Sequence, residues 1–302
     1  MRFKIQIIFI FFLSLIAFPQ VNTTYTLKVL GVVQDGGLPH LGSNKLCCDE
    51  TQSNRHVTSI ILINNDNNCS YLFDASPDIN EQLNFMGDRI KKDLKGIFLT
   101  HAHIGHYTGL MYFGREALNS KAINVYAMPR MKKFLEQNGP WSQLVSLENI
   151  VINELNNNLK ISLDSNIIVQ PFEVPHRSEF SETVGYKIYG PNKKALFIPD
   201  IDKWYMWDKS IIDEIKKVDY ALVDATFYDS KEVNYRDISE IPHPFVIESM
   251  ELFDSLNVNE KNKIYFIHIN HTNPLLDKDS DQYKYVTGKG YNVAEEGMNL
   301  KL

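Results

Sequence analysis

Short apolar segments alternate with polar turns along the chain after residue 25, and most of these segments have the length of β-strands. Runs rich in β-branched and aromatic residues predict strands at Thr26–Val33, Thr58–Ile63, Tyr71–Phe73, Gly96–Leu99, Ile167–Val174, Val184–Tyr189, Ala195–Ile198, Tyr220–Val223 and Ile264–Ile267. Helical patterns are predicted between them at Ile79–Met86, Leu110–Leu118, Met128–Asn138, Ser210–Lys216 and Pro244–Leu256. The Asn-rich stretch from Asn153 to Asn158 predicts a turn. The length of 302 residues suits one large domain or two small ones.

Five of the apolar strands end at a polar side chain that can bind a metal ion. In chain order these side chains are His101, His176, Asp200, Asp224 and His268. Buried strands that deliver polar groups to one edge of a sheet place a site on rigid elements. One such strand end is compatible with a hydrogen-bonded polar group of the core, but five together predict a functional site.

The densest group of metal-binding side chains is His101, His103 and His106, directly after the run Gly96–Leu99. Neutral imidazole is the commonest metal ligand in proteins. Three imidazoles within six residues therefore predict a metal-dependent active site. Chance clustering is the alternative, and the residues at the other strand ends argue against it.

The charge of the chain argues against one class of function. The net charge is −6 and the Lys and Arg residues form no long block, whereas a general nucleic-acid-binding protein is basic. The apolar content of 44% and the charged content of 23% are ordinary for a globular protein. We therefore expect a small-molecule substrate and no nucleic-acid partner.

The first twenty residues differ in character from the rest of the chain. Arg2 and Lys4 precede an apolar run from Ile5 to Phe18, which is the arrangement of a secretory signal peptide. The run is short for a membrane span, which needs about 20 residues. We predict a signal peptide over residues 1–20 and export to the periplasm or the exterior. An uncleaved N-terminal anchor and a buried helix are the alternatives, and no other membrane segment is expected.

The chain contains three cysteines, Cys47, Cys48 and Cys69. An odd number does not form a complete disulfide framework in an exported protein. The adjacent Cys47 and Cys48 are poorly suited to bond with each other, because the resulting ring is strained. Metal ligation and simple burial are the two ways in which these thiols would be protected from oxidation.

The histidine cluster resembles a known signature. The segment His101-Ala102-His103-Ile104-Gly105-His106 is similar to the His-x-His-x-Asp-His motif of the metallo-β-lactamase fold. His176, Asp200 and His268 follow in the order in which that family places its remaining ligands. The resemblance implies a single domain over residues 25–302 with an α/β (α+β) architecture. In this αββα sandwich, two mixed β-sheets pack face to face, helices cover the outer faces, and metal ions bind at one edge.

Four segments narrow the resemblance to one branch. Residues 31–40, 174–177, 198–202 and 268–274 are similar to motifs of PqqB-like proteins. PqqB is named for biosynthesis of the redox cofactor pyrroloquinoline quinone. The same N-terminal layout also resembles the PhnP-type cyclic-phosphate phosphodiesterases.

The resemblance implies a set of metal ligands. His101, His103 and His176 would form a first metal site, His106 and His268 would serve a second, and Asp200 would bridge the two. Imidazoles with a carboxylate suit Zn²⁺, and also iron or manganese. One or two zinc ions are therefore expected.

Gly105 departs from the family pattern, which has an aspartate ligand of the second metal at this position. The second site is then expected to be weaker, absent, or completed by another group, for which Asp202 and Asp224 are the candidates. The segment Gln34-Asp35-Gly36-Gly37 lacks the spacing of a phosphate-binding loop. We interpret it as a tight turn near the metal edge.

A structural zinc site is a further implication of the likeness to the PhnP type. His271 has the spacing of a zinc ligand in those proteins, and Cys47 and Cys48 would be its partners. Ser43 stands near the place where another cysteine is expected, so three of the four ligands of a closed site are found. A filled site and an empty one both remain open.

The leading functional hypothesis is a metal-dependent hydrolase that uses a metal-bound hydroxide on a phosphodiester or ester of a small molecule. Asp200 would hold the metal and orient the nucleophile, and His243 would protonate the leaving group. For His243, the alternative is a residue at a helix start that only bonds to the backbone. An iron-dependent oxidative enzyme linked to quinone-cofactor biosynthesis and a non-catalytic, exported metal- or substrate-binding protein are the rival functions.

Overall fold

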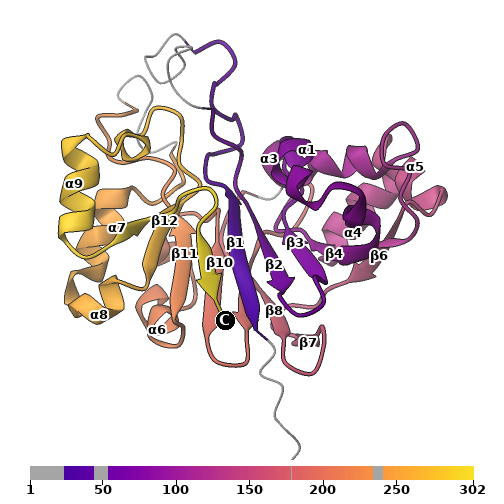
Figure 1. The fold of residues 1–302 in the computed structure, drawn as a ribbon. Coiled ribbons are helices and arrows are strands. Elements are labelled where there is room, and N and C mark those ends of the chain that lie inside the picture. The colour runs from indigo at the N-terminus through magenta and orange to yellow at the C-terminus, as the bar shows by residue number, and fades with distance from the viewer. Residues whose placement is uncertain (1–23, 44–53, 178, 234–240) are drawn as a thin grey trace, which may run out of the picture.

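The computed structural model describes residues 24–43, 54–177, 179–233 and 241–302. Two seven-stranded sheets form the centre of the molecule (Figure 1). The first sheet, in spatial order, contains β14 (Asn299–Lys301), β1 (Tyr25–Gly31), β2 (Ser59–Asn64), β3 (Ser70–Phe73), β4 (Leu94–Phe98), β5 (Ile123–Ala127) and β6 (Ile150–Glu154). The second contains β13 (Asn292–Val293), β12 (Ile264–Ile267), β11 (Tyr220–Asp224), β10 (Lys194–Ile198), β9 (Val184–Tyr189), β8 (Ile168–Glu173) and β7 (Ile161–Ser162).

Helices flank the two sheets on opposite sides (Figure 1). On the side of the first sheet lie α1 (Ile79–Gln82), α2 (Ile90–Asp93), α3 (Ile104–Tyr107), α4 (Pro129–Gln137) and α5 (Trp141–Ser146). On the side of the second lie α6 (Ile211–Lys216), α7 (Val246–Leu252), α8 (Val258–Lys261) and α9 (Asp281–Gly288). Within the described residues, no helix combines the length and the apolar character that crossing a membrane requires.

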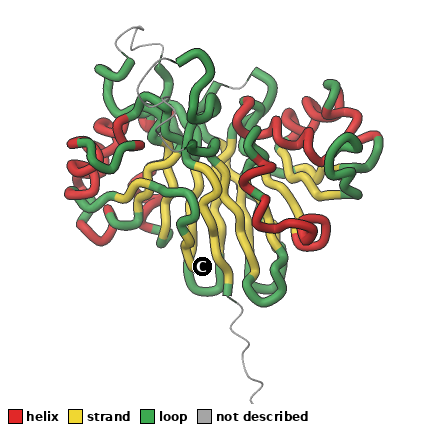
Figure 2. The backbone as a smooth tube through the Cα atoms, turned by 45° about the horizontal axis from the view of Figure 1, so that its top comes forward, coloured by secondary structure: helices red, strands yellow, loops and turns green. Residues whose placement is uncertain are grey.

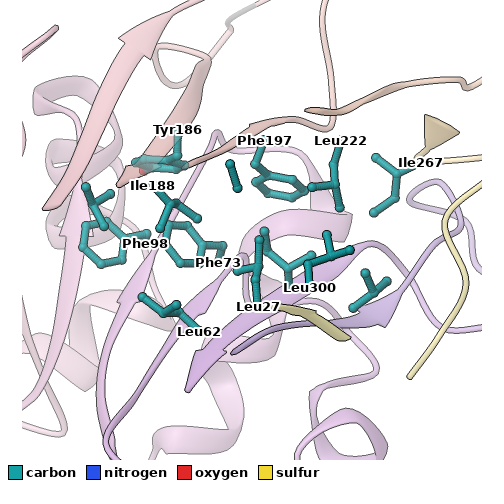
Figure 3. Packing of buried hydrophobic residues seen from close by; sticks show 14 of the residues in the cluster. Leu27, Leu62, Phe73, Phe98, Tyr186, Ile188, Phe197, Leu222, Ile267 and Leu300 are labelled. Atoms are coloured by element: carbon teal, nitrogen blue, oxygen red, sulfur yellow. The ribbon is translucent and has the colours of Figure 1, made fainter. Parts of the chain in front are cut away.

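The main core lies between the sheets and is rich in aromatic rings (Figure 3). Phe73 and Phe98 of the first sheet stack with their centroids 5.0 Å apart. Tyr186 of the second sheet meets both rings edge-on, at 5.4 and 5.6 Å. Two further apolar clusters fill the space between each sheet and its helices. The apolar strands predicted from the sequence are therefore buried on both faces, which explains their nearly continuous hydrophobic pattern.

Both sheets combine antiparallel and parallel pairing, so they are mixed. The strands β3 to β6 run parallel to their neighbours, as do β10 to β13, while β1 to β3 and β7 to β10 pair antiparallel. This pairing directs the carboxyl ends of β1, β3 and β4 to one edge of the first sheet, and those of β8, β10, β11 and β12 to one edge of the second. Figure 2 shows the strands leading into loops that gather at this end of the molecule. The predicted αββα sandwich is confirmed.

The structure corrects several local predictions. The helix expected at Leu110–Leu118 is a 3₁₀ helix at Thr108–Phe113 followed by turns. The Asn-rich turn begins later than expected, because Asn153 belongs to β6. Neither β5 nor β6 was predicted. The predicted signal peptide lies outside the described residues, and so do Cys47 and Cys48.

Candidate metal centre

A first group of four metal-binding side chains meets at the shared edge of the sheets. It consists of His101, His103, His176 and Asp200, which each offer one ligand atom within 4.8 Å of the others. The Asp200 carboxylate lies 3.2 Å from Nε2 of His101 and 3.2 Å from Nε2 of His176. His103 turns Nδ1 inward, 2.8 Å from Nε2 of His101. Residues from the ends of β4, β8 and β10 thus converge as the sequence pattern predicts.

A second group lies beside the first and consists of Asp35, His106 and His268. Oδ1 of Asp35 is 3.2 Å from Nε2 of His106 and 3.9 Å from Nε2 of His268. Oδ2 of Asp200 is 4.0 Å from each of the same two nitrogens. Asp200 therefore faces both groups, which is the position of a bridging carboxylate.

His243 joins Asp200 to a third carboxylate. Its Nδ1 lies 2.9 Å from Oδ2 of Asp224 and 3.2 Å from Oδ1 of Asp200. Asp224 is fully buried and also accepts hydrogen bonds from the backbone N–H and the hydroxyl of Thr226, at 2.8 and 2.7 Å. The His243 side chain keeps 11% of its surface exposed. His243 is therefore held by two carboxylates and still reaches solvent.

Hydrogen bonds orient the histidines that face the two groups with Nε2. Nδ1 of His106 donates to Asp74 over 2.7 Å, and Nδ1 of His101 donates to the Thr100 hydroxyl over 3.0 Å. The same hydroxyl donates to Asp74 over 2.9 Å, and the Thr100 N–H does so over 2.7 Å. A partner on one ring nitrogen selects the tautomer and leaves the lone pair of the other for a cation.

His176 and His268 are also oriented by a partner on Nδ1. Nδ1 of His176 donates to Asp202 over 2.9 Å. Nδ1 of His268 lies 2.9 Å from the hydroxyl of Thr226, which itself donates to Asp224. Nε2 of each ring therefore points toward the groups as an acceptor.

His103 differs because its inner atom is Nδ1. In the tautomer that carries the proton on Nδ1, the outer nitrogen Nε2 accepts a hydrogen bond of 3.2 Å from Nε of Arg177. A carboxylate oxygen of Glu179 lies 3.5 Å from the same nitrogen. Glu179 is thus placed to accept the Nε2 proton in the tautomer that leaves Nδ1 free for a cation.

Several buried polar atoms in the two groups have no hydrogen-bond partner. They are Nε2 of His106, His176 and His268, and Oδ1 of Asp35 and Asp200. Leaving a buried polar atom unsatisfied costs about 1–3 kcal/mol, and more for charged groups. Buried, unpartnered atoms that converge in this way can serve as ligands of cations, so the residues fit the metal ions that the fold implies.

Burial and neighbouring charges shift the pKa values of the ionisable side chains in the site. Burial opposes ionisation of Asp200, but His176 and His243 outweigh it and hold the pKa of Asp200 well below its usual range. Burial also opposes the charged form of His106, and the nearby Asp74 and Asp35 nevertheless raise the pKa of His106 well above its usual value. Burial, reinforced by the neighbouring charge of His106, lowers the pKa of His101. The carboxylates thus favour positive charge at this edge of the sheets, which a proton on His106 supplies in the metal-free site and a metal cation would supply in its place.

The backbone at two of these residues occupies an uncommon conformation. His268 has φ of 63° and Asp74 has φ of 65°, in the left-handed region that side chains other than glycine seldom adopt. Each residue follows directly after a strand, β12 or β3. Such strain persists where the surrounding structure requires a particular side-chain direction.

The structure brings together every residue predicted for the two metal sites and places His243 next to them. Neither Asp202 nor Asp224 completes the second group, which corrects that expectation. Asp202 instead accepts a hydrogen bond from Nδ1 of His176, the nitrogen that faces away from the first group, and Asp224 pairs with Nδ1 of His243. The residue that sequence reasoning missed is Asp35, although the tight turn containing it was predicted near the metal edge. A glycine at position 105 was the available signal, because its missing side chain leaves room for another group.

The predicted structural zinc site can be followed only in part, since Cys47 and Cys48 lie outside the described residues. The ring of His271 stacks on that of His40 with a centroid distance of 4.0 Å. Nδ1 of His271 lies 3.1 Å from Oδ1 of Asn270. Ligation of a structural zinc by these residues stays a prediction.

Comparisons with known proteins agree with this architecture. The family described as the Beta-lactamase superfamily domain matches residues 70–269. The "Coenzyme PQQ synthesis protein B" of Rhizobium meliloti is 24% identical over 314 residues, which cover 93% of this chain and 100% of that protein. These matches confirm the resemblance to the metallo-β-lactamase fold and to its PqqB-like branch.

Two solved structures show the same fold. The Zn²⁺-bound PqqB from Methylobacterium extorquens superposes with a TM-score of 0.76 at 22% identity, and the match covers 92% of this chain and 100% of that one. A diphosphatase from the PhnP family superposes with a TM-score of 0.64 at 20% identity, over 92% of this chain and 97% of that one.

Proposed function

The chain belongs to the β-lactamase superfamily, and from this premise we propose that it is a metal-dependent hydrolase acting on a phosphodiester or ester bond of a small molecule. The observation that carries the proposal is the sharing of Asp200 between two groups of buried, unpartnered ligand atoms. Metal ions held by these two groups would supply Lewis-acid activation of water and of the substrate oxygens. The relatives named above include a diphosphatase, which supports hydrolysis of a phosphate-containing bond.

The protein's own residues supply the proton needed by the leaving group. Nδ1 of His243 is held between Asp200 and Asp224, so the ring is fixed in orientation and its positive charge is balanced. The remaining nitrogen then carries the proton for the departing oxygen. Thr226 fixes Asp224 through two hydrogen bonds and keeps this geometry in place.

One positively charged side chain at the rim, that of Arg177, supports an anionic substrate. It is 65% exposed, and its Nε lies 3.2 Å from His103 of the first group and 3.9 Å from the Glu179 carboxylate. A guanidinium binds phosphate oxygens in a bidentate manner. Arg177 is therefore positioned to hold the non-reacting oxygens of a phosphodiester, and this supports a phosphodiester over a neutral ester.

The metal is proposed to be zinc, with iron or manganese as chemically suitable alternatives. Imidazole nitrogens with one or two carboxylates are typical of catalytic zinc sites, and the relative from Methylobacterium extorquens contains Zn²⁺.

The N-terminal segment, residues 1–20, supports export of the protein. The small-molecule substrate would then be bound outside the cytoplasm.

A role in the biosynthesis of a quinone cofactor is the second candidate. It is favoured by relatives of 24–27% identity over nearly the whole chain that are named for coenzyme PQQ synthesis. A centre of histidines and carboxylates with open positions can hold iron for oxidative chemistry. Iron in the purified protein together with oxygen uptake would favour this candidate, and zinc without oxygen uptake would favour hydrolysis.

The full chain, reconstituted with Zn²⁺, should hydrolyse bis(4-nitrophenyl) phosphate in a reaction that a chelator stops and added Zn²⁺ restores. Arg177→Gln should raise KM for this anion more than it lowers kcat. Arg115→Gln is the matched control, because that side chain is also exposed, at 59%, and pairs with Glu116 away from both groups. A folded, metal-loaded protein that cleaves neither this substrate nor a panel of lactones and aryl esters would rule out the hydrolase.

A further inference from the structure

The side chain of Asp35 occupies the space beside Gly105. A Cβ atom built on Gly105 would lie 2.2 Å from Oδ1 of Asp35 and 2.9 Å from its Cα. Contacts below 3.0 Å are essentially absent for real Cβ atoms. Any side chain at position 105 therefore excludes Asp35 from its observed place, and the glycine is what allows the carboxylate to enter.

The loop that carries Asp35 is attached to the strand end that carries His268. Val33 forms a parallel bridge with Ile269, the Gln34 N–H donates to the Ile269 carbonyl over 3.0 Å, and the Ile269 N–H donates to Val32 over 2.8 Å. The Gly37 N–H closes the turn on the Gln34 carbonyl over 2.9 Å. Backbone hydrogen bonds on both sides of Asp35 thus fix its carboxylate relative to His268.

The atoms that meet in this group lack other partners. Oδ1 of Asp35 and Nε2 of both His106 and His268 are buried without a hydrogen bond. Both imidazoles are fully buried. Nδ1 of His106 donates to Asp74, and Nδ1 of His268 faces the hydroxyl of Thr226. Two lone pairs and a carboxylate that converge within 4.8 Å call for a cation between them.

We propose that Asp35 is the carboxylate ligand of a second metal ion, which it binds together with His106, His268 and the shared Asp200. The ligand comes from the loop after β1, whereas the family pattern provides it from the position of Gly105. This proposal rests on the metal centre of the proposed function and adds the carboxylate that completes its second site. The second ion would then have two carboxylate ligands, Asp35 and Asp200, whereas the first has Asp200 alone.

The test counts zinc ions per chain on the full protein, so that its readout does not depend on turnover. Every protein in the test carries Cys47→Ser and Cys48→Ser, so that the predicted structural zinc site is not counted, and the otherwise wild-type protein dialysed against Zn²⁺ should retain two ions. Asp35→Asn preserves the size of the side chain and removes its charge, and it should retain one. Loss of a residue that only supports a ligand costs roughly 10–100-fold in metal affinity, so loss of this ligand should weaken the second ion by at least about 100-fold.

Two further variants separate ligation from general damage. Gly105→Ala leaves Asp35 in the chain but displaces it, so it should also lose the second ion. Asp254→Asn is the matched control, because Asp254 has an 85% exposed side chain that pairs with Lys261 away from the centre. It should retain two ions. Circular dichroism of each variant shows that it is folded, and Asp35→Asn decides the outcome where Gly105→Ala is unfolded.

The results distinguish this proposal from the function on which it rests. Two ions of unchanged affinity in Asp35→Asn would overturn the role of Asp35 and leave a metal-dependent hydrolase intact. One ion in both the wild type and Asp35→Asn would do the same. A folded wild-type protein that binds no zinc, iron or manganese would instead overturn the proposed function and the second ion together.

Discussion

Asp74 lies 2.7 Å from Nδ1 of His106, and both side chains are fully buried. Asp74 directly follows β3, and His106 lies in α3, the first helix after the neighbouring parallel strand β4, so the pairing of β3 with β4 helps to bring them together. Asp74 also accepts two hydrogen bonds from Thr100. Asp74 therefore fixes the direction of His106, which belongs to the second group. It also fixes the start of the segment that carries His101 and His103 of the first group.

Asp74→Asn should weaken zinc binding by roughly 10–100-fold, because the amide no longer fixes the tautomer of His106. The free energy of unfolding of the metal-free protein should fall by about 1–3 kcal/mol, since the new NH₂ group opposes buried donors. Competition titration with a chelator and urea unfolding measure the two effects. Equal zinc affinity in variant and wild type would contradict the orienting role, with Asp254→Asn as the control.

His243→Gln should lower kcat for phosphodiester hydrolysis by roughly 10²–10⁴-fold, the range of a general acid, while the zinc content stays at the wild-type value. Steady-state kinetics and a metal count on the same preparation give both quantities. His56→Gln is the matched control, because the side chain of His56 pairs with Glu81 and Glu296 and with none of the metal-binding groups. A variant that loses zinc in proportion to activity would show that His243 acts through metal binding instead.

His56 should make folding stability depend on pH. Its hydrogen bond to Glu296, against the opposing effect of burial, raises the pKa of His56 from 6.5 to about 9. The folded state therefore binds a proton more tightly than the unfolded state does. The resulting stabilisation is fully present below the unfolded pKa of 6.5 and is lost as the pH rises through about 9.

Urea unfolding of wild type and His56→Gln over this pH range measures the effect. The wild type should be the more stable protein at about pH 6, and the difference should shrink toward zero above about pH 9. Glutamine keeps a hydrogen-bond donor but cannot become charged, so it isolates the proton. Parallel stability curves at every pH would show that the ion pair of His56 with Glu296 contributes nothing.

Phe197→Ala should destabilise the fold by about 3–5 kcal/mol, because it opens a cavity between the two sheets. Phe197 is fully buried and meets Phe73 edge-on at 6.5 Å (Figure 3). Tyr205→Ala is the control, since that side chain is 85% exposed, and the change should stay within about 0.5 kcal/mol. Chemical denaturation of both variants tests this, and a small loss for Phe197→Ala would mean that the sheets repack.

Removal of the metal should lower the thermal stability of the protein. An ion that binds only the folded state stabilises it by about 2.7 kcal/mol at a concentration 100 times its Kd. A chelator should therefore decrease Tm, and Zn²⁺ added after dialysis should restore it. His101→Ala should show a smaller response to zinc than the wild type, and an equal response would place the stabilising ion elsewhere.

Much of the architecture and of the first metal group follows from local sequence patterns. Strands such as β4 and β10 are apolar on both faces, and a polar side chain directly after each strand must lie at the edge of its sheet. The spacing of His101, His103 and His106 therefore located the centre without knowledge of the strand order. Local patterns were less informative for Leu110–Leu118, where the 3₁₀ helix Thr108–Phe113 contacts α1 and α5, which are distant partners that the local pattern does not show.

Asp35 shows what the sequence by itself left undecided. Its role depends on a bridge between Val33 and Ile269, on the pairing of β1 within the first sheet, and on the missing side chain of Gly105. None of these contacts is local, so no spacing along the chain records them. Residues that follow buried strands are placed by periodicity, whereas a ligand delivered by a loop is placed by whatever that loop pairs with, and only the tertiary structure determines this.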